Sequence, residues 1–185
     1  EKMLPVKITY TLLLLLMATL LNASELPLKT VAFAQDTMAN DFRKAQVLEV
    51  RDALAARPDI QFTYSDAKGQ TSLLIRQIEK FILSQVDLII VGTNHADAVV
   101  PVISKAYRHG IPVIILDRGI NSSEYTTFIN SDNIKIGGIG ADYIAKRLEG
   151  KGVVLLLEGI QEADVTQLRS KGFLDEIAKY PGIKI

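Results

Sequence analysis

The segment Ile111–Arg118 constrains the fold of this chain most, because an apolar run ends there abruptly at an acid and a base. Apolar side chains at successive strand positions point to both faces of a sheet, so both faces must be covered. Such strands are typical of a parallel sheet with helices on both sides. Ligands bind these sheets outside the carboxyl ends of the strands, where Asp117 and Arg118 lie. A carboxylate and a guanidinium suit the hydroxyls of a small polar molecule, and a salt-bridged strand end is the alternative.

Further apolar segments alternate with amphipathic ones along the chain. The expected strands are Thr30–Ala34, Ile60–Tyr64, Val86–Val91, Ile111–Leu116, Tyr125–Asn130, Val153–Leu157 and one that begins at Ile183. The expected helices are Asp41–Arg57, Thr71–Ser84, Ala96–Arg108, Ile134–Leu148 and Val165–Lys179. Strand, helix and strand in succession form right-handed βαβ units. We therefore predict an α/β fold with a doubly wound parallel sheet, in which Val153–Leu157 is also fully buried.

The charge and composition exclude several classes of function. Lys plus Arg equals Asp plus Glu, at 21 each, so the chain has no basic excess for binding nucleic acid. The chain has no cysteine, which excludes disulfides and thiolate metal sites. Its two histidines, His95 and His109, have no neighbouring residues that suit a zinc site. We expect no metal, no cofactor and no nucleic-acid partner. We also expect that the protein is not an enzyme, because the sequence contains no visible nucleophile–base pair.

The first 24 residues have the order of a secretory signal. Lys2 and Lys7 precede the apolar run Thr11–Leu21, and the small polar segment Asn22–Ser24 follows it. The apolar run is short for a membrane span, which needs about 20 residues. We predict that residues 1–24 are a signal peptide or an uncleaved membrane anchor, and that the protein is exported to a periplasm of the Gram-negative type. Contact with the membrane is expected only through this segment.

Polar residues follow the expected strands at several places, and in a parallel sheet such strand ends meet at one edge. They are Gln35–Asp36, Asp66, Thr93–His95, Asp117–Arg118, Ser131–Asn133 and Glu158. Phe42 and Arg43 begin the first helix beside that edge. The Phe42 ring can stack on a sugar while Arg43 donates to its hydroxyls, and the alternative is that Phe42 packs into the core. The sequence therefore predicts a polar crevice for a small ligand.

Three glycines in the segment Gly137–Gly140 lie within an expected helix rather than in a turn after a strand. Their spacing does not match the dinucleotide-binding pattern, and the strand–turn–helix context of that motif is missing. We predict that they form a helix surface for close packing.

Several of these segments together resemble periplasmic sugar-binding proteins of the ribose and galactose type, which share their fold with the effector domains of LacI-type repressors. The resemblance extends from about Lys29 to Ile185, and galactofuranose-type binders are the most similar. The segments that carry it are Phe33–Gln35 with Phe42–Arg43, Ile111–Arg118, Ser131–Asn133, Gly138 with Asp142–Lys146, Leu157–Gly159 and Arg169–Phe173. One member of the family carries an acid at the position of Ala39 and a Trp at that of Phe42, and Glu158 stands where a Gln is usual.

The resemblance implies a type I periplasmic-binding-protein fold with two lobes that close on the ligand. Residues 25–131 would form the N-terminal sugar-binding lobe, which is incomplete, and residues 132–185 the truncated start of a second lobe. The candidate ligand-binding residues are Gln35, Phe42, Arg43, Asn94, Asp117, Arg118 and Arg169, the last by its family position. The expected hinge residues are Ser131, Asp132 and Asn133. Because the later ligand-bearing segments of the family have no counterpart here, we expect residues 25–185 alone to bind sugar weakly or not at all.

The function that this resemblance implies is capture of a monosaccharide for the permease of an ABC-type sugar transporter. The alternative is the sugar-sensing ectodomain of a membrane receptor such as a histidine kinase. An intracellular repressor is disfavoured, because a secretory segment occupies the place of a DNA-binding headpiece. The sequence does not identify the sugar.

Overall fold

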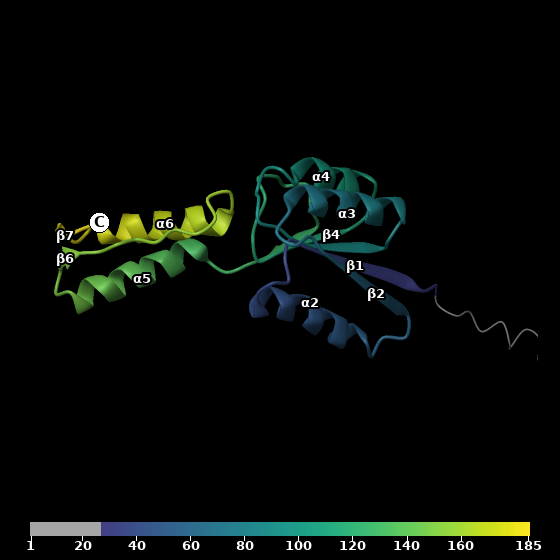
Figure 1. Ribbon diagram of the computed structural model, residues 1–185, viewed down its shortest axis with the longest axis horizontal. Coiled ribbons are helices and arrows are strands. Elements are labelled where there is room, and N and C mark those ends of the chain that lie inside the picture. Colours follow the sequence, from purple (N-terminus) through teal and green to yellow (C-terminus); the bar gives the residue numbers. More distant parts are fainter. Residues whose placement is uncertain (1–26) are drawn as a thin grey trace, which may run out of the picture.

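The computed structural model describes residues 27–185, so the predicted signal segment 1–24 lies outside the described residues. Figure 1 shows two units that are joined by one short segment. We call residues 29–129 the first unit and residues 133–184 the second unit. No helix within residues 27–185 is long and apolar enough to cross a membrane.

The first unit contains a five-stranded parallel sheet in the order β2-β1-β3-β4-β5. Its strands are β1 (Lys29–Gln35), β2 (Ile60–Asp66), β3 (Leu88–Gly92), β4 (Val113–Leu116) and β5 (Thr127–Ile129). The chain moves outward from β1 to β2 and then crosses back to β3, so the topology switches direction between β1 and β3. In open α/β sheets, the carboxyl ends of the strands at such a switch point flank the ligand crevice. The predicted parallel α/β fold is confirmed.

Helices cover both faces of this sheet. Helix α2 (Asp41–Leu54) lies on one face, and α3 (Thr71–Leu83) and α4 (Val100–Arg108) lie on the other (Figure 1). Asn40 is the N-cap of α2, and its side chain accepts a hydrogen bond from the Arg43 amide. This cap fixes the first turn of α2 beside the carboxyl end of β1.

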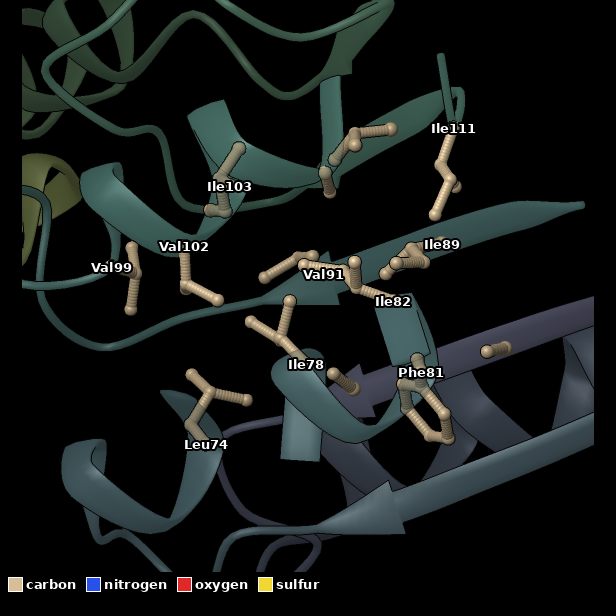
Figure 2. Close-up of a cluster of buried hydrophobic side chains, with 14 of the residues drawn as sticks. Leu74, Ile78, Phe81, Ile82, Ile89, Val91, Val99, Val102, Ile103 and Ile111 are labelled. Atoms are coloured by element: carbon tan, nitrogen blue, oxygen red, sulfur yellow. The ribbon is translucent and has the colours of Figure 1, made fainter. Parts of the chain in front are cut away.

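The larger core of the first unit lies between the sheet and helices α3 and α4, and a smaller one lies between the sheet and α2. Figure 2 shows the α3 side chains Leu74 and Ile78 facing the β3 side chains Ile89 and Val91. All four side chains have no exposed surface. A core of this kind holds the strand ends at fixed positions, because close packing leaves little room for backbone movement.

Two predicted helices are shorter in the structure than the sequence indicated. Helix α4 begins at Val100 rather than Ala96, because residues 96–99 form a turn in which His95 Nδ1 accepts from the amides of Asp97 and Ala98. Helix α2 ends at Leu54 rather than Arg57. The chain then turns toward β2, and the amide of Ile60 donates to the carbonyl of Arg57.

The second unit consists of α5 (Asn133–Arg147), β6 (Lys151–Val153), α6 (Asp164–Ile177) and β7 (Gly182–Lys184). Helices α5 and α6 cross in close contact at two glycines. A Cβ on Gly137 would collide with the carbonyl of Arg169, and a Cβ on Gly172 would collide with the carbonyl of Ile134. The prediction that the α5 glycines form a close-packing helix surface is confirmed at Gly137.

The predicted burial of Val153–Leu157 is wrong. Strand β6 ends at Val153, and the side chains of Leu155 and Leu157 are 82% and 83% exposed. Strand β6 pairs with β7 alone within the described residues. Apolar side chains on both faces of a strand are buried only where a layer covers each face, which the two-stranded sheet of the second unit does not provide.

Candidate ligand-binding site

Charged side chains from three elements meet at the switch point of the first sheet. Gln35 and Asp36 are at the carboxyl end of β1, Arg43 is in the first turn of α2, and Asp117 and Arg118 follow β4. Ion pairs join the four charged residues and hydrogen bonds join Gln35 to Arg43, so the predicted convergence of polar strand ends is confirmed for these residues.

The ion pairs alternate in charge across the cluster. Arg43 Nη2 lies 3.1 Å from Asp117 Oδ2, and Arg43 Nη1 lies 3.7 Å from Asp36 Oδ1. Arg118 Nη1 lies 3.4 Å from Asp36 Oδ2. Asp36 therefore lies between two guanidinium groups, and Arg43 lies between two carboxylates. We call these four residues the ionic cluster.

The ionic cluster has a buried layer and an accessible layer. The side chains of Asp36 and Arg43 are almost completely buried, whereas those of Asp117 and Arg118 are 23% and 21% exposed. Burial raises the pKa of Asp36, and the neighbouring guanidinium groups of Arg43 and Arg118 oppose that rise. Burial also lowers the pKa of Arg43, against the effect of Asp36. A ligand at this edge would meet Asp117 and Arg118 first.

Gln35 lies behind Arg43 and is fully buried. Its Nε2 donates to the Arg43 carbonyl and to Gln46 Oε1, each at 3.1 Å. Its Oε1 accepts from the Asp36 amide at 3.2 Å and from Arg43 Nη1 at 3.5 Å. In this conformation Gln35 fixes the position of Arg43, and direct contact of Gln35 with a sugar stays a prediction.

Asp117, which follows β4, has a left-handed backbone conformation, with φ at +68°. Non-glycine residues seldom adopt this region, and such residues are concentrated at functional sites. The Asp117 amide still donates to the Ile129 carbonyl at 2.8 Å, which anchors the turn to the neighbouring strand. The turn directs the side chains of Asp117 and Arg118 toward the cluster, so the salt-bridged strand end exists and is also partly accessible.

Phe42 and Asn94 are beside the same edge. Phe42 is 61% exposed, so the alternative that it packs into the core is wrong. Its exposed ring is available for stacking, which stays a prediction. Asn94 is half-buried, and its side chain accepts from Thr71 Oγ1 at 3.2 Å and donates to the Gly69 carbonyl at 3.4 Å. Asn94 is therefore held against the loop between β2 and α3.

Arg169 and the predicted hinge form a separate hydrogen-bonded group at the start of the second unit. Arg169 Nε donates to Asn133 Oδ1 at 2.9 Å, and Asn133 Nδ2 donates to the Ser131 carbonyl at 3.1 Å. Asp132 is the N-cap of α5 and accepts from the Lys135 amide. Arg169 also lines a cavity of about 290 Å³ between α5, α6 and residues 156–159. The ion pairs of the described residues do not join Arg169 to the ionic cluster.

The two units contact one another near this edge. The Ala96 amide donates to the Glu162 carbonyl at 3.0 Å. Gly119, which follows Arg118, lies against Asp164, where an added Cβ would be 2.6 Å from Asp164 Oδ2. Residues 27–185 contain no group of three His, Asp or Glu side chains that could hold a metal ion.

Sequence reasoning included Asp36 among the polar strand ends but not among the candidate binding residues. The available signal was its position directly after a buried strand, close to two predicted binding arginines. The sequence does not show that Asp36 contacts both of them, because that contact depends on how the ends of β1 and β4 and the start of α2 meet.

The family model described as "Periplasmic binding protein domain" matches residues 31–185. Among curated proteins, the galactofuranose-binding protein YtfQ of Escherichia coli is 32% identical over 160 residues. That match covers 84% of this chain and 50% of YtfQ. The chain thus spans about half the length of the curated relatives it matches.

Solved structures of periplasmic sugar-binding proteins superpose on this chain. The fructose-binding periplasmic domain of a hybrid two-component system superposes with a TM-score of 0.81 at 31% identity, covering 85% of this chain and 52% of that chain. The periplasmic binding component of the arabinose ABC transporter from Shewanella sp. ANA-3 superposes with a TM-score of 0.76 at 30% identity. That match covers 85% of this chain and 53% of that chain.

Proposed function

Because the chain belongs to the periplasmic binding protein domain family, we propose that it is the N-terminal part of a two-lobed solute-binding protein for a monosaccharide. The complete protein would deliver its sugar to the permease of an ABC-type transporter. It would be exported to the periplasm through residues 1–24, and it would bind neither nucleic acid nor a cofactor and would not be an enzyme.

The observation that supports this proposal most is the accessible pair Asp117 and Arg118, together with the exposed ring of Phe42, which precedes Arg43 in α2. An ionised carboxylate accepts hydrogen bonds from sugar hydroxyls, and a guanidinium donates two in a fixed geometry. The aromatic ring offers an apolar face on which the C–H side of a sugar ring can stack. Together these groups match the amphipathic surface of a monosaccharide.

The proposed mechanism is closure of two lobes about the segment that joins the units. Ser131, Asp132 and Asn133 would act as the hinge, and Arg169 would bring a cation from the second lobe onto the sugar. In hinge closure a few residues at the ends of elements absorb the change in backbone angles. The bond from Arg169 to Asn133 ties that cation to the hinge segment in the present conformation. The closed form is the one that we expect the permease to recognise.

A sugar-sensing ectodomain of a membrane receptor is the second candidate function. It is favoured by one observation, the structural likeness to the fructose-binding domain of a hybrid two-component system. Deleting the gene separates the two functions. Loss of uptake of the radiolabelled sugar supports the transporter protein, and loss of sugar-induced transcription with intact uptake supports the receptor.

The primary test is a thermal-shift screen of the complete protein against D-ribose, L-arabinose, D-galactose and D-fructose. A sugar that binds the folded state raises the melting temperature, and at equal concentration a tighter-binding sugar raises it more. With the best sugar, calorimetry should show that Asp117→Ala and Arg118→Ala each weaken binding by about 1.5–3 kcal/mol, because each removes a charge-assisted hydrogen bond. Arg57→Ala is the matched control, since Arg57 pairs with Asp59 in the exposed turn before β2. Unchanged affinity in both site variants would remove Asp117 and Arg118 from the proposed site.

A further inference from the structure

Asp36 is the most constrained member of the ionic cluster, although it is not among the residues expected to touch the sugar. Its amide donates to the Gly92 carbonyl at 2.9 Å, and its own carbonyl accepts from the Gly69 amide at 2.7 Å. These bonds attach Asp36 to the end of β3 and to the loop after β2. Its carboxylate is therefore fixed at the switch point by backbone bonds on two sides.

The carboxylate of Asp36 is the counter-ion that the two arginines share. Arg118 forms its only described ion pair with Asp36, at 3.4 Å. Arg43 pairs with both Asp36 and Asp117. Asp36 Oδ1 is buried and has no hydrogen-bond partner within the described residues, so its interaction with Arg43 at 3.7 Å is ionic. The fixed carboxylate of Asp36 therefore adds to the bond from Gln35 in holding Arg43, and it is the anion that holds Arg118.

The charges of the ionic cluster sum to zero when all four residues are ionised, because Arg43 and Arg118 are matched by Asp36 and Asp117. A site with two arginines would otherwise attract carboxylates, which guanidinium groups bind in a bidentate manner. Since Asp36 is buried, it affects a ligand through the arginines and through its charge rather than by contact.

We propose that Asp36 is a positioning residue that fixes Arg43 and Arg118 and, by balancing their charge, makes the site select uncharged sugars over sugar acids. This inference rests on the function proposed above. It assigns the specificity of the site to a residue behind the binding surface.

The test compares neutral and acidic ligands of similar shape. Binding of D-ribose with D-ribonate, and of D-galactose with D-galacturonate, is measured by calorimetry at neutral pH on the complete protein. Asp36→Asn keeps the shape of the side chain but removes its charge. The ratio of neutral to acidic affinity should fall by about tenfold or more, because one negative charge that pairs with both arginines has been removed. A purely structural role would weaken both ligands alike and leave the ratio unchanged.

Two further variants serve as controls. Asp36→Glu retains the charge and should preserve the ratio even if both affinities fall. Asp87→Asn is the matched control, because Asp87 pairs with Lys29 near the amino end of the sheet and is far from the cluster in the fold. It should leave both affinities and their ratio at wild-type values. If Asp36→Asn does not fold, Asp36→Ser removes the same charge and has the same expected result.

The outcomes separate this inference from the proposed function. A wild-type protein that binds none of the sugars overturns the proposed function and this inference with it. A wild-type protein that binds sugar, together with an Asp36→Asn ratio equal to the wild-type ratio, overturns the inference alone. A fall in the ratio that also occurs in Asp36→Glu or Asp87→Asn overturns it as well, since the charge of Asp36 would then not be the cause.

Discussion

The two units contain apolar strand segments of the same kind with opposite outcomes. In the first unit, Val113 and Ile115 of β4 have no exposed surface, because β3 and β5 flank the strand and helices cover the sheet. In the second unit, Leu155 and Leu157 are more than four-fifths exposed. The difference lies in the layers around each segment and not in its amino acids.

An apolar run in the sequence does not ensure that its side chains are buried, because burial also needs other layers that cover them. The first unit provides these layers, because its sheet has five strands and helices on both faces. The second unit has two strands, and its small core centres on the buried residues Ala141, Ala145 and Ile177. The two units should therefore differ strongly in their free energy of unfolding when each is produced alone. Four experiments test or refine this difference.

The largest expected effect is the behaviour of the two units when they are produced separately. Residues 27–132 should unfold cooperatively in urea, because they contain a five-stranded sheet with helices on both faces. Residues 130–185 should show no cooperative transition and should bind the dye ANS, because a core of this size does not offset the entropy of folding. Circular dichroism and dye fluorescence measure both properties. A sharp urea transition for residues 130–185 would show that the second unit needs no further layer.

The next effect is the cost of shortening one apolar side chain in each unit. Ile115→Ala should lower the free energy of unfolding by about 2–5 kcal/mol, because it leaves a cavity in a closely packed core. Leu155→Ala should change it by less than about 0.5 kcal/mol, as expected for an exposed side chain. Urea denaturation of the 185-residue chain measures both variants. Similar losses in the two variants would contradict the assignment of the Leu155 side chain to the surface.

A smaller effect is expected at the contact between α5 and α6. Gly172→Ala should destabilise the second unit by about 1–3 kcal/mol, because its Cβ would collide with the Ile134 carbonyl and force the helices apart. Gly140→Ala is the matched control in α5, since a Cβ there meets nothing within 4 Å. That control should be neutral or should stabilise the helix by up to about 1 kcal/mol. Hydrogen exchange of the α5 amides distinguishes the two variants, and equal protection in both would argue against close helix packing at Gly172.

The order of elements was predictable because the hydrophobic period is local. Strands β1 to β4 and helices α2 and α3 follow runs of apolar residues whose spacing is visible in the sequence alone. The start of α4 was not predictable in this way, because His95 caps a turn whose geometry depends on the neighbouring loop. The exposure of Leu155 was not predictable either, since burial depends on layers that a local pattern does not contain.

The candidate site was predictable at its surface and less so in its interior. Asp117 and Arg118 were identifiable because an apolar strand ends at them. The burial of Arg43 was not, because an arginine near a helix start is usually exposed and is buried only when paired. Its carboxylate partners come from the ends of β1 and β4, which are on either side of β3 and reach the same edge only after the sheet has formed.

The smallest expected effect is a pH dependence of stability that comes from Asp36 in the first unit. Burial raises the pKa of Asp36 above its ordinary value of 3.8, so the folded state takes up a proton more readily than the unfolded state. Stability from this group is therefore fully present below pH 3.8 and is lost as the pH rises through the raised pKa. The exposed carboxylates of Asp87 and Asp142 have lowered pKa values and act in the opposite direction, so the whole-protein profile hides the effect. The difference in unfolding free energy between wild type and Asp36→Asn isolates it, because both proteins share every other group. That difference, wild type minus variant, should decrease with rising pH in this window, and an increase would mean that the arginines outweigh burial at Asp36.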